Sequence, residues 1–198
     1  MRRLVVPFVL AAVLTGCSTT EPGTPSAGNP TSGTPTTGTS AGTAPVDRPK
    51  AVDMLTLDPC SLITPEAKAK LGIRTVGSVA ADPEYGEGGK ACGASYEDRK
   101  VTYSIDTIVN GGVERLKSTE GKVKELTELK VAGYPAYLTK GPSQATGSPQ
   151  CEIYLDSHDQ QLLRVSVIGG LGSDATLDLA CERAKALAEA VGPVLATK

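Results

Sequence analysis

The amino-acid sequence predicts an α+β domain over residues 52–198, with an antiparallel sheet of about five to six strands that carries a short N-terminal helix and a longer C-terminal helix. Three features predict this fold. Apolar and polar residues alternate in segments joined by short polar turns, which is the period of half-buried strands connected as hairpins. Apolar residues then recur at helical spacing near the end of the chain. Four cysteines in the same region indicate two disulfides.

The first helix is expected between Thr64 and Gly72. The Thr64 hydroxyl can accept a hydrogen bond from a free N–H of the first turn, and Pro65 suits that turn because it has no N–H to satisfy. Gly72 can adopt the left-handed conformation that ends many helices. Residues 82–90, which are acidic and rich in glycine, are expected to form a loop.

Two hairpins form the centre of the predicted sheet. The first joins strands at residues 94–97 and 101–109 through a turn at 98–100. The second joins a strand that opens at Cys151 to residues 162–168. The remaining expected elements are a short helix at 114–119, strands at 130–132 and 136–139 around a turn at 133–135, and a loop at 141–150.

The longest helix is expected over residues 174–191. Ser173 or Asp174 can cap its start, and Gly192 with Pro193 is expected to stop it. Its apolar positions repeat every three or four residues, at Leu177, Ala180, Cys181, Ala184, Leu187, Ala188 and Val191.

The four cysteines of this region are Cys60, Cys92, Cys151 and Cys181. An even number in an exported chain implies two disulfides with three possible connectivities. Pairing in sequence order would close two loops of about 30 residues, each stabilising by about 3.5 kcal/mol in the chain-entropy model. The nested pairing would instead tie the ends of the domain together, and both pairings stay open. No metal site is expected, because no Cys-x-x-Cys pair occurs and the chain has one histidine.

The N-terminus has the parts of an export signal. Arg2 and Arg3 precede an apolar run over residues 4–14 that is too short to span a bilayer. The sequence Leu-Thr-Gly-Cys at residues 14–17 then resembles the signal of bacterial lipoproteins. That resemblance implies removal of residues 1–16 as a signal peptide and attachment of lipid to Cys17. We therefore expect a chain held by its lipid on the extracytoplasmic face of the cell membrane.

Residues 17–51 are expected to form a disordered linker behind the lipidated cysteine. From residue 18 to residue 45, all residues except Glu21 and Asn29 are Ser, Thr, Gly, Pro or Ala. Such a segment has no large apolar side chain whose burial could offset the entropy of ordering the backbone.

The charge distribution and the residue types of the chain argue against nucleic-acid binding and against catalysis. Residues 51–198 carry 16 Lys and Arg against 20 Asp and Glu, and the basic residues alternate with acidic ones, so no nucleic-acid partner is expected. His158, the only histidine, lies in a polar turn, and no Gly-x-Ser-x-Gly nucleophile motif occurs. We expect no enzyme activity, no catalytic residues and no cofactor.

Tyrosine provides the only aromatic side chains of the expected mature chain, since Trp is absent and Phe8 leaves with the signal peptide. Tyr96, Tyr103 and Tyr154 fall in expected strands, where they would pack against the sheet. The other three, Tyr85, Tyr134 and Tyr137, are expected to be partly exposed. A patch of Tyr134 and Tyr137 beside the loop at 141–150, together with Tyr85, is the candidate binding surface.

An ordered set of motifs resembles a known family. The set comprises Asp-Pro-Cys-Ser-Leu-Ile-Thr at 58–64, Cys92 near a strand, Gly-Tyr-Pro-Ala at 133–136, Cys151, and Cys-x-x-Ala-x-x-Leu-Ala from Cys181. It resembles secreted actinobacterial lipoproteins of a domain-of-unknown-function family, the family numbered 3558. The chain departs from the family in carrying Ala-Ser-Tyr at 94–96, where such sequences often have Trp. The resemblance implies location and fold, and it supplies no catalytic residues.

The function expected from the sequence is therefore that of a membrane-anchored binding or interaction module of the cell envelope without enzyme activity. Its candidate partners are the membrane through the lipid on Cys17, and an envelope protein, a glycan or a small apolar ligand. The alternative is an accessory protein or enzyme that acts on envelope glycans or lipids.

Overall fold

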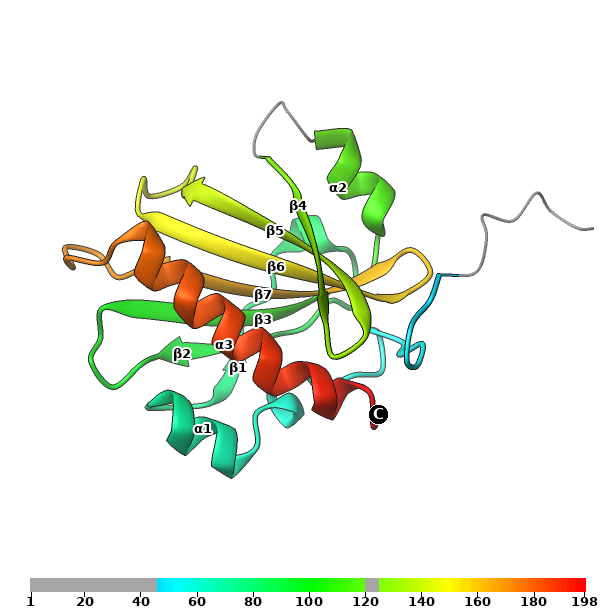
Figure 1. The fold of residues 1–198 in the computed structure, drawn as a ribbon, viewed down its shortest axis with the longest axis horizontal. Coiled ribbons are helices and arrows are strands. Elements are labelled where there is room, and N and C mark those ends of the chain that lie inside the picture. The colour runs from blue at the N-terminus through cyan, green and yellow to red at the C-terminus, as the bar shows by residue number, and fades with distance from the viewer. Residues whose placement is uncertain (1–45, 120–124) are drawn as a thin grey trace, which may run out of the picture. The chain divides into compact units, whose positions relative to one another are not determined.

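The computed structural model describes residues 46–119 and 125–198. They form one antiparallel sheet of seven strands in the order β1-β2-β3-β7-β6-β5-β4, and the long helix α3 lies across one face of it (Figure 1). The predicted α+β fold is confirmed, with more strands than expected. The expectations for the signal peptide, for Cys17 and for the linker up to residue 45 fall outside the described residues.

The element bounds are as follows. The strands are β1 Gly77–Val79, β2 Ala91–Ser95, β3 Val101–Ile108, β4 Thr127–Val131, β5 Tyr134–Pro142, β6 Pro149–His158 and β7 Gln161–Gly169. The helices are α1 Pro65–Leu71, α2 Val113–Thr119 and α3 Leu177–Leu195, and short 3-10 turns occur at η1 Pro59–Leu62 and η2 Pro83–Tyr85. The additional strand is β1, an edge strand of three exposed residues. It was missed because a strand with no buried face leaves no alternating pattern.

Helix α1 has the predicted ends. Thr64 Oγ1 accepts a hydrogen bond from the N–H of Ala67 at 3.1 Å. Gly72 closes the helix with a left-handed φ of 63°, and its N–H is directed to the carbonyls of Ala69 and Lys68.

Both expected ends of helix α3 are wrong. Thr176 caps the start, since its Oγ1 accepts from the N–H of Leu179 at 3.2 Å, and neither Ser173 nor Asp174 does so. The helix also continues through Gly192 and Pro193 to Leu195. Leu195 is fully buried, so core packing holds the last turn in place although Pro193 cannot donate a backbone hydrogen bond.

The core lies between α3 and one face of the sheet. Successive strand residues point to opposite faces, so every second residue of β3, β5, β6 and β7 reaches this core. The most deeply buried of them include Tyr103, Ile105, Tyr134, Ala136, Ile153, Leu155, Val165 and Val167.

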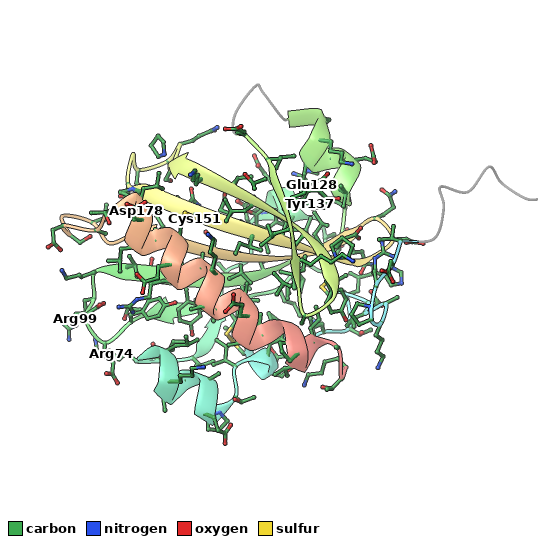
Figure 2. The ribbon with its side chains drawn as sticks, in the orientation of Figure 1. Arg74, Arg99, Glu128, Tyr137, Cys151 and Asp178 are labelled. Atoms are coloured by element: carbon green, nitrogen blue, oxygen red, sulfur yellow. A yellow bond between two sulfur atoms is a disulfide. The ribbon has the colours of Figure 1, made fainter. Side chains whose placement is uncertain are left out.

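Two disulfides fasten this core, and they follow the sequence-order pairing. Cys60–Cys92 joins η1 to β2 with a Cα–Cα distance of 5.1 Å. Cys151–Cys181 joins β6 to α3 at 4.9 Å, and Figure 2 labels Cys151 on its strand near the N-terminal half of α3. The nested alternative is thereby excluded. Each bond connects elements that hydrogen bonds of the sheet do not connect.

The segment before the first helical turn is fixed to the end of β6. The Arg48 guanidinium donates to Asp156 Oδ1 at 2.7 Å through Nη2 and to Asp159 Oδ1 at 2.8 Å through Nη1. The N–H of Val52 donates to the carbonyl of Ser157 at 2.9 Å. Arg48 belongs to the residues expected to form the linker, so contacts with the domain begin before residue 52.

We expect Arg48→Ala to lower the free energy of unfolding by about 2 kcal/mol, because it leaves the carboxylate of Asp156 without its charged partner. The matched control is Lys130→Ala, since the pair of Lys130 with Asp47 is exposed on both sides and should contribute less than about 1 kcal/mol. Urea-induced unfolding of the purified protein measures both values. Equal losses in the two variants would show that Arg48 contributes no more than an ordinary surface charge.

Candidate functional site

The sheet face opposite α3 carries three buried charged residues at its centre. Asp106 on β3, Glu152 on β6 and Arg164 on β7 are only 5%, 5% and 9% exposed. They meet because β7 lies between β3 and β6. The register places Arg164 directly opposite Asp106 on one side and opposite Tyr154 on the other.

The three residues form two short ion pairs with a shared guanidinium. Arg164 Nη1 donates to Asp106 Oδ2 at 2.6 Å, while Nε and Nη2 donate to Glu152 Oε1 at 2.9 Å and 2.6 Å. Hydroxyl groups complete the network: Ser104 Oγ donates to Asp106 Oδ2 at 2.7 Å, and Thr139 Oγ1 donates to Glu152 Oε2 at 3.0 Å. A buried charge loses its hydration, and ion pairs and hydrogen bonds of this kind offset that cost.

Burial raises the pKa of Asp106 above its ordinary 3.8, although Arg164 and the Ser104 hydroxyl oppose the change. The folded protein therefore binds a proton at Asp106 more readily than the unfolded chain does. It follows that the contribution of Asp106 to stability decreases as the pH rises above its unfolded pKa. Burial lowers the pKa of Arg164, but Glu152, Tyr154 and Asp106 raise it by more, so the guanidinium stays charged.

Tyr85 covers this cluster from η2. Its ring centroid lies 5.3 Å from the guanidinium carbon of Arg164, which is the geometry of a cation–π contact. The turn is held in place because Asp82 Oδ1 accepts from the N–H of Glu84 at 2.9 Å and the Tyr85 carbonyl accepts from the N–H of Val109 at 2.8 Å. Burial raises the pKa of Tyr85 to about 12, so the phenol is neutral at physiological pH.

A cavity of about 520 Å³ opens on this face of the sheet, within the size range of small-molecule sites. Its wall combines two tyrosine rings, charged side chains, amides and branched aliphatic side chains. The main lining residues are Tyr85, Tyr154, Asp82, Glu84, Glu152, Arg115, Gln144, Gln150, Ile108, Leu116, Leu126 and Leu162. The cavity can therefore contact both polar and apolar parts of a ligand.

The three tyrosines expected to form a binding surface lie in different places. Tyr85 lines the cavity. Tyr134 is fully buried in the core, so the expectation that it is partly exposed is wrong. Tyr137 lies on the other face of β5, opposite Glu128 of β4 as in Figure 2, with Lys117 Nζ 5.8 Å from its ring. Residues three apart in a strand point to opposite faces, so Tyr134 and Tyr137 cannot form one patch.

Sequence reasoning missed Asp106, Glu152 and Arg164, and it assigned Tyr154 only to sheet packing. The sequence did carry one signal, because each of the three strands has a charged residue near its middle. Charged residues are seldom buried unless they are paired, so a charge at such a position indicates a partner. The sequence does not reveal that β3 pairs with β7, and without that pairing the three charges have no reason to meet.

The described ranges lack two kinds of feature. Over residues 46–119 and 125–198, no three His, Cys, Asp or Glu side chains are grouped so that they could hold a metal ion. In the same part of the chain, no helix combines the length and the apolar character needed to cross a membrane.

Comparison with known proteins places the chain in a family without assigning an activity. No curated protein and no solved structure matches it. The model of the family described as "Protein of unknown function (DUF3558)" matches residues 12–193. Since that match spans the cysteine motifs, the hairpins, α1 and all but the last two residues of α3, the chain belongs to the DUF3558 family of proteins of unknown function.

Proposed function

We propose that this protein is a lipid-anchored lipoprotein of the extracytoplasmic membrane face, whose domain is a non-enzymatic module that binds a small envelope molecule. The observation that carries the binding role is the cavity of about 520 Å³ over the paired Arg164, Asp106 and Glu152. A rigid polar floor beneath a mixed wall suits ligand recognition, because its groups are already oriented before the ligand arrives.

The state of the buried carboxylates favours binding over catalysis. Glu152 accepts hydrogen bonds on both oxygens, from Arg164 on Oε1 and from Thr139 on Oε2. Asp106 Oδ2 accepts from both Arg164 and Ser104. A general base needs a lone pair directed at the substrate proton, and these oxygens direct theirs at protein donors. Among the candidate partners, a concave site also favours a small molecule or a glycan unit over an envelope protein.

Ligand retention tests the binding role. The lipoprotein is purified from membranes in nonionic detergent, exposed to envelope glycan fragments and solubilised envelope extract, and analysed by native mass spectrometry. We expect one small molecule to be retained, with affinity about tenfold or more weaker in Tyr85→Ala, as for loss of an anchoring aromatic ring. Tyr137→Ala is the matched control, because it removes a half-buried ring outside the cavity. Equal retention in both variants, or turnover of the molecule, would contradict the proposal.

The lipid anchor is tested separately by metabolic labelling. Labelled palmitate should enter the wild-type protein and Thr19→Ser but not Cys17→Ser, and Cys17→Ser should also leave the membrane fraction. The reason is that the thiol of Cys17 is the expected attachment atom, and acyl chains contribute about 0.8 kcal/mol of membrane affinity per buried methylene. Incorporation of label into Cys17→Ser refutes the lipoprotein assignment.

A further inference from the structure

We propose that the cavity on the charged sheet face binds an organic cation, a small molecule that carries a protonated amine on a ring or other compact apolar body. This inference rests on the proposed binding function and names its ligand class. Charge, aromatic wall and apolar wall each support it independently.

The cavity is surrounded by an excess of negative charge. Among the residues that the structure describes, four acidic residues lie in its wall or directly beneath it, against two guanidiniums, which gives a net charge of −2: Asp82, Glu84, Asp106 and Glu152 against Arg115 and Arg164. The charge of Arg164 is already offset by its two carboxylate partners at 2.6 Å. An anionic ligand would therefore meet repulsion, whereas a cation gains from a low-dielectric cleft of opposite sign.

The remaining guanidinium is engaged in holding the wall together. Arg115 Nη1 donates to the carbonyl of Glu84 at 2.8 Å and to Oδ1 of Asn110. The Nδ2 of Asn110 in turn donates to the same Glu84 carbonyl at 2.8 Å. These bonds join the start of α2 to η2 through the backbone of Glu84, which is itself one of the residues that line the cavity.

The aromatic wall adds a second attraction for a cation. Tyr85 and Tyr154 both line the cavity, and burial raises the pKa of each phenol, so both rings are neutral. The Tyr85 ring already contacts one cation, Arg164, at 5.3 Å. Neutral phenols attract ammonium groups through the ring face and through the hydroxyl oxygen.

The apolar wall indicates that the cation is organic. Four branched aliphatic residues line the same cavity, namely Ile108, Leu116, Leu126 and Leu162. A hydrated metal ion would gain nothing from these side chains, and the described residues contain no grouping of metal ligands. An amine on a ring or short aliphatic body satisfies the carboxylates, the phenols and the aliphatic wall together.

Three probes with the same ring and different charge test the proposal: cyclohexylamine, cyclohexanol and cyclohexanecarboxylate. Each is titrated at pH 7 against the full lipoprotein in nonionic detergent and followed by ligand-observed NMR. We expect the ammonium to bind about fivefold or more tightly than the alcohol, with the carboxylate weakest. Added salt should weaken the binding of the ammonium probe and leave the affinity for the alcohol unchanged, because salt screens only the charged probe.

Paired variants assign this preference to the cavity. Glu84→Gln should lower the affinity for the ammonium probe about two- to fivefold and leave the affinity for the alcohol unchanged. Glu128→Gln, a carboxylate outside the cavity, should change neither. Equal affinities for ammonium and alcohol, both dependent on Tyr85, would overturn the charge preference and leave the binding module intact. Tightest binding of the carboxylate would also overturn it. Both proposals would be contradicted if none of the probes binds and if Tyr85→Ala retains the envelope ligand as well as the wild-type protein does.

Discussion

Arg164→Met is expected to lower the free energy of unfolding by about 3–5 kcal/mol at pH 7. The guanidinium is the shared partner of Asp106 and Glu152, both 5% exposed, and methionine removes the positive charge that both carboxylates share. The loss should far exceed that of Arg74→Met, a change at an exposed arginine, which we expect to cost less than about 0.5 kcal/mol. Urea-induced unfolding of both variants measures the difference.

The pH dependence of this loss has a definite sign. Burial already raises the pKa of Asp106, and the change to methionine removes the positive charge of Arg164, which is the strongest influence that opposes this rise. In the variant the folded state then binds more protons than the unfolded state above the ordinary carboxyl pKa. Its free energy of unfolding should fall as the pH rises, so the deficit at pH 5 is smaller than at pH 7. A deficit that grows on acidification would contradict this account.

A triple variant separates charge from packing. Adding Asp106→Asn and Glu152→Gln to Arg164→Met removes the two carboxylate charges while it keeps the side-chain shapes nearly unchanged. We expect it to recover a substantial part of the lost free energy, because replacing a complete buried ion network costs less than breaking it. If the triple variant is no more stable than Arg164→Met, the loss arises from packing of the arginine side chain.

Removal of the Cys151–Cys181 disulfide is the second change with a large expected effect. The double variant Cys151→Ala/Cys181→Ala should lose about 3.5 kcal/mol, because the unfolded chain regains the entropy of a loop with a sequence separation of 30 residues. Thermal and urea unfolding of the oxidised protein and of the variant measure it.

The other disulfide provides a matched control. Cys60–Cys92 has a sequence separation of 32, so the chain-entropy account predicts nearly the same loss for Cys60→Ala/Cys92→Ala. In each pair one sulfur-bearing residue is fully buried, Cys92 or Cys151. A difference of more than about 1 kcal/mol between the double variants would show that interactions in the folded state, and not loop entropy, dominate one of the bonds.

The parts of the fold that the sequence predicted correctly depend on neighbouring residues. The ends of α1 follow from Thr64 and Gly72, within the helix's own turns. The β6–β7 hairpin follows from alternation and a short polar turn. The end of α3 was wrong because the local signal of Gly192 and Pro193 is outweighed by burial of Leu195 in the core.

The candidate site depends on distant residues and was therefore missed. Asp106 and Arg164 are 58 positions apart, and they meet only through the pairing of β3 with β7. Two open disulfide patterns likewise needed the order of the strands before one could be chosen. The error at Tyr134 differs in kind. The residue was expected in a turn at 133–135, whereas β5 begins at Tyr134, and strand alternation then places its ring and that of Tyr137 on opposite faces.

The attachment of the N-terminal segment to β6 determines how the domain responds to tension. A pull on the chain ahead of residue 47 first loads the exposed ion pair of Asp47 with Lys130, and then the ion pairs of Arg48 with Asp156 and Asp159 and the hydrogen bond from Val52 to Ser157. The contacts of Arg48 and Val52, which are the more buried ones, are at the end of β6, an interior strand with hydrogen-bonded neighbours on either side and a covalent link to α3 through Cys151. The force thus enters the middle of the sheet, where strands must slide past one another together, instead of an edge that could be peeled away bond by bond.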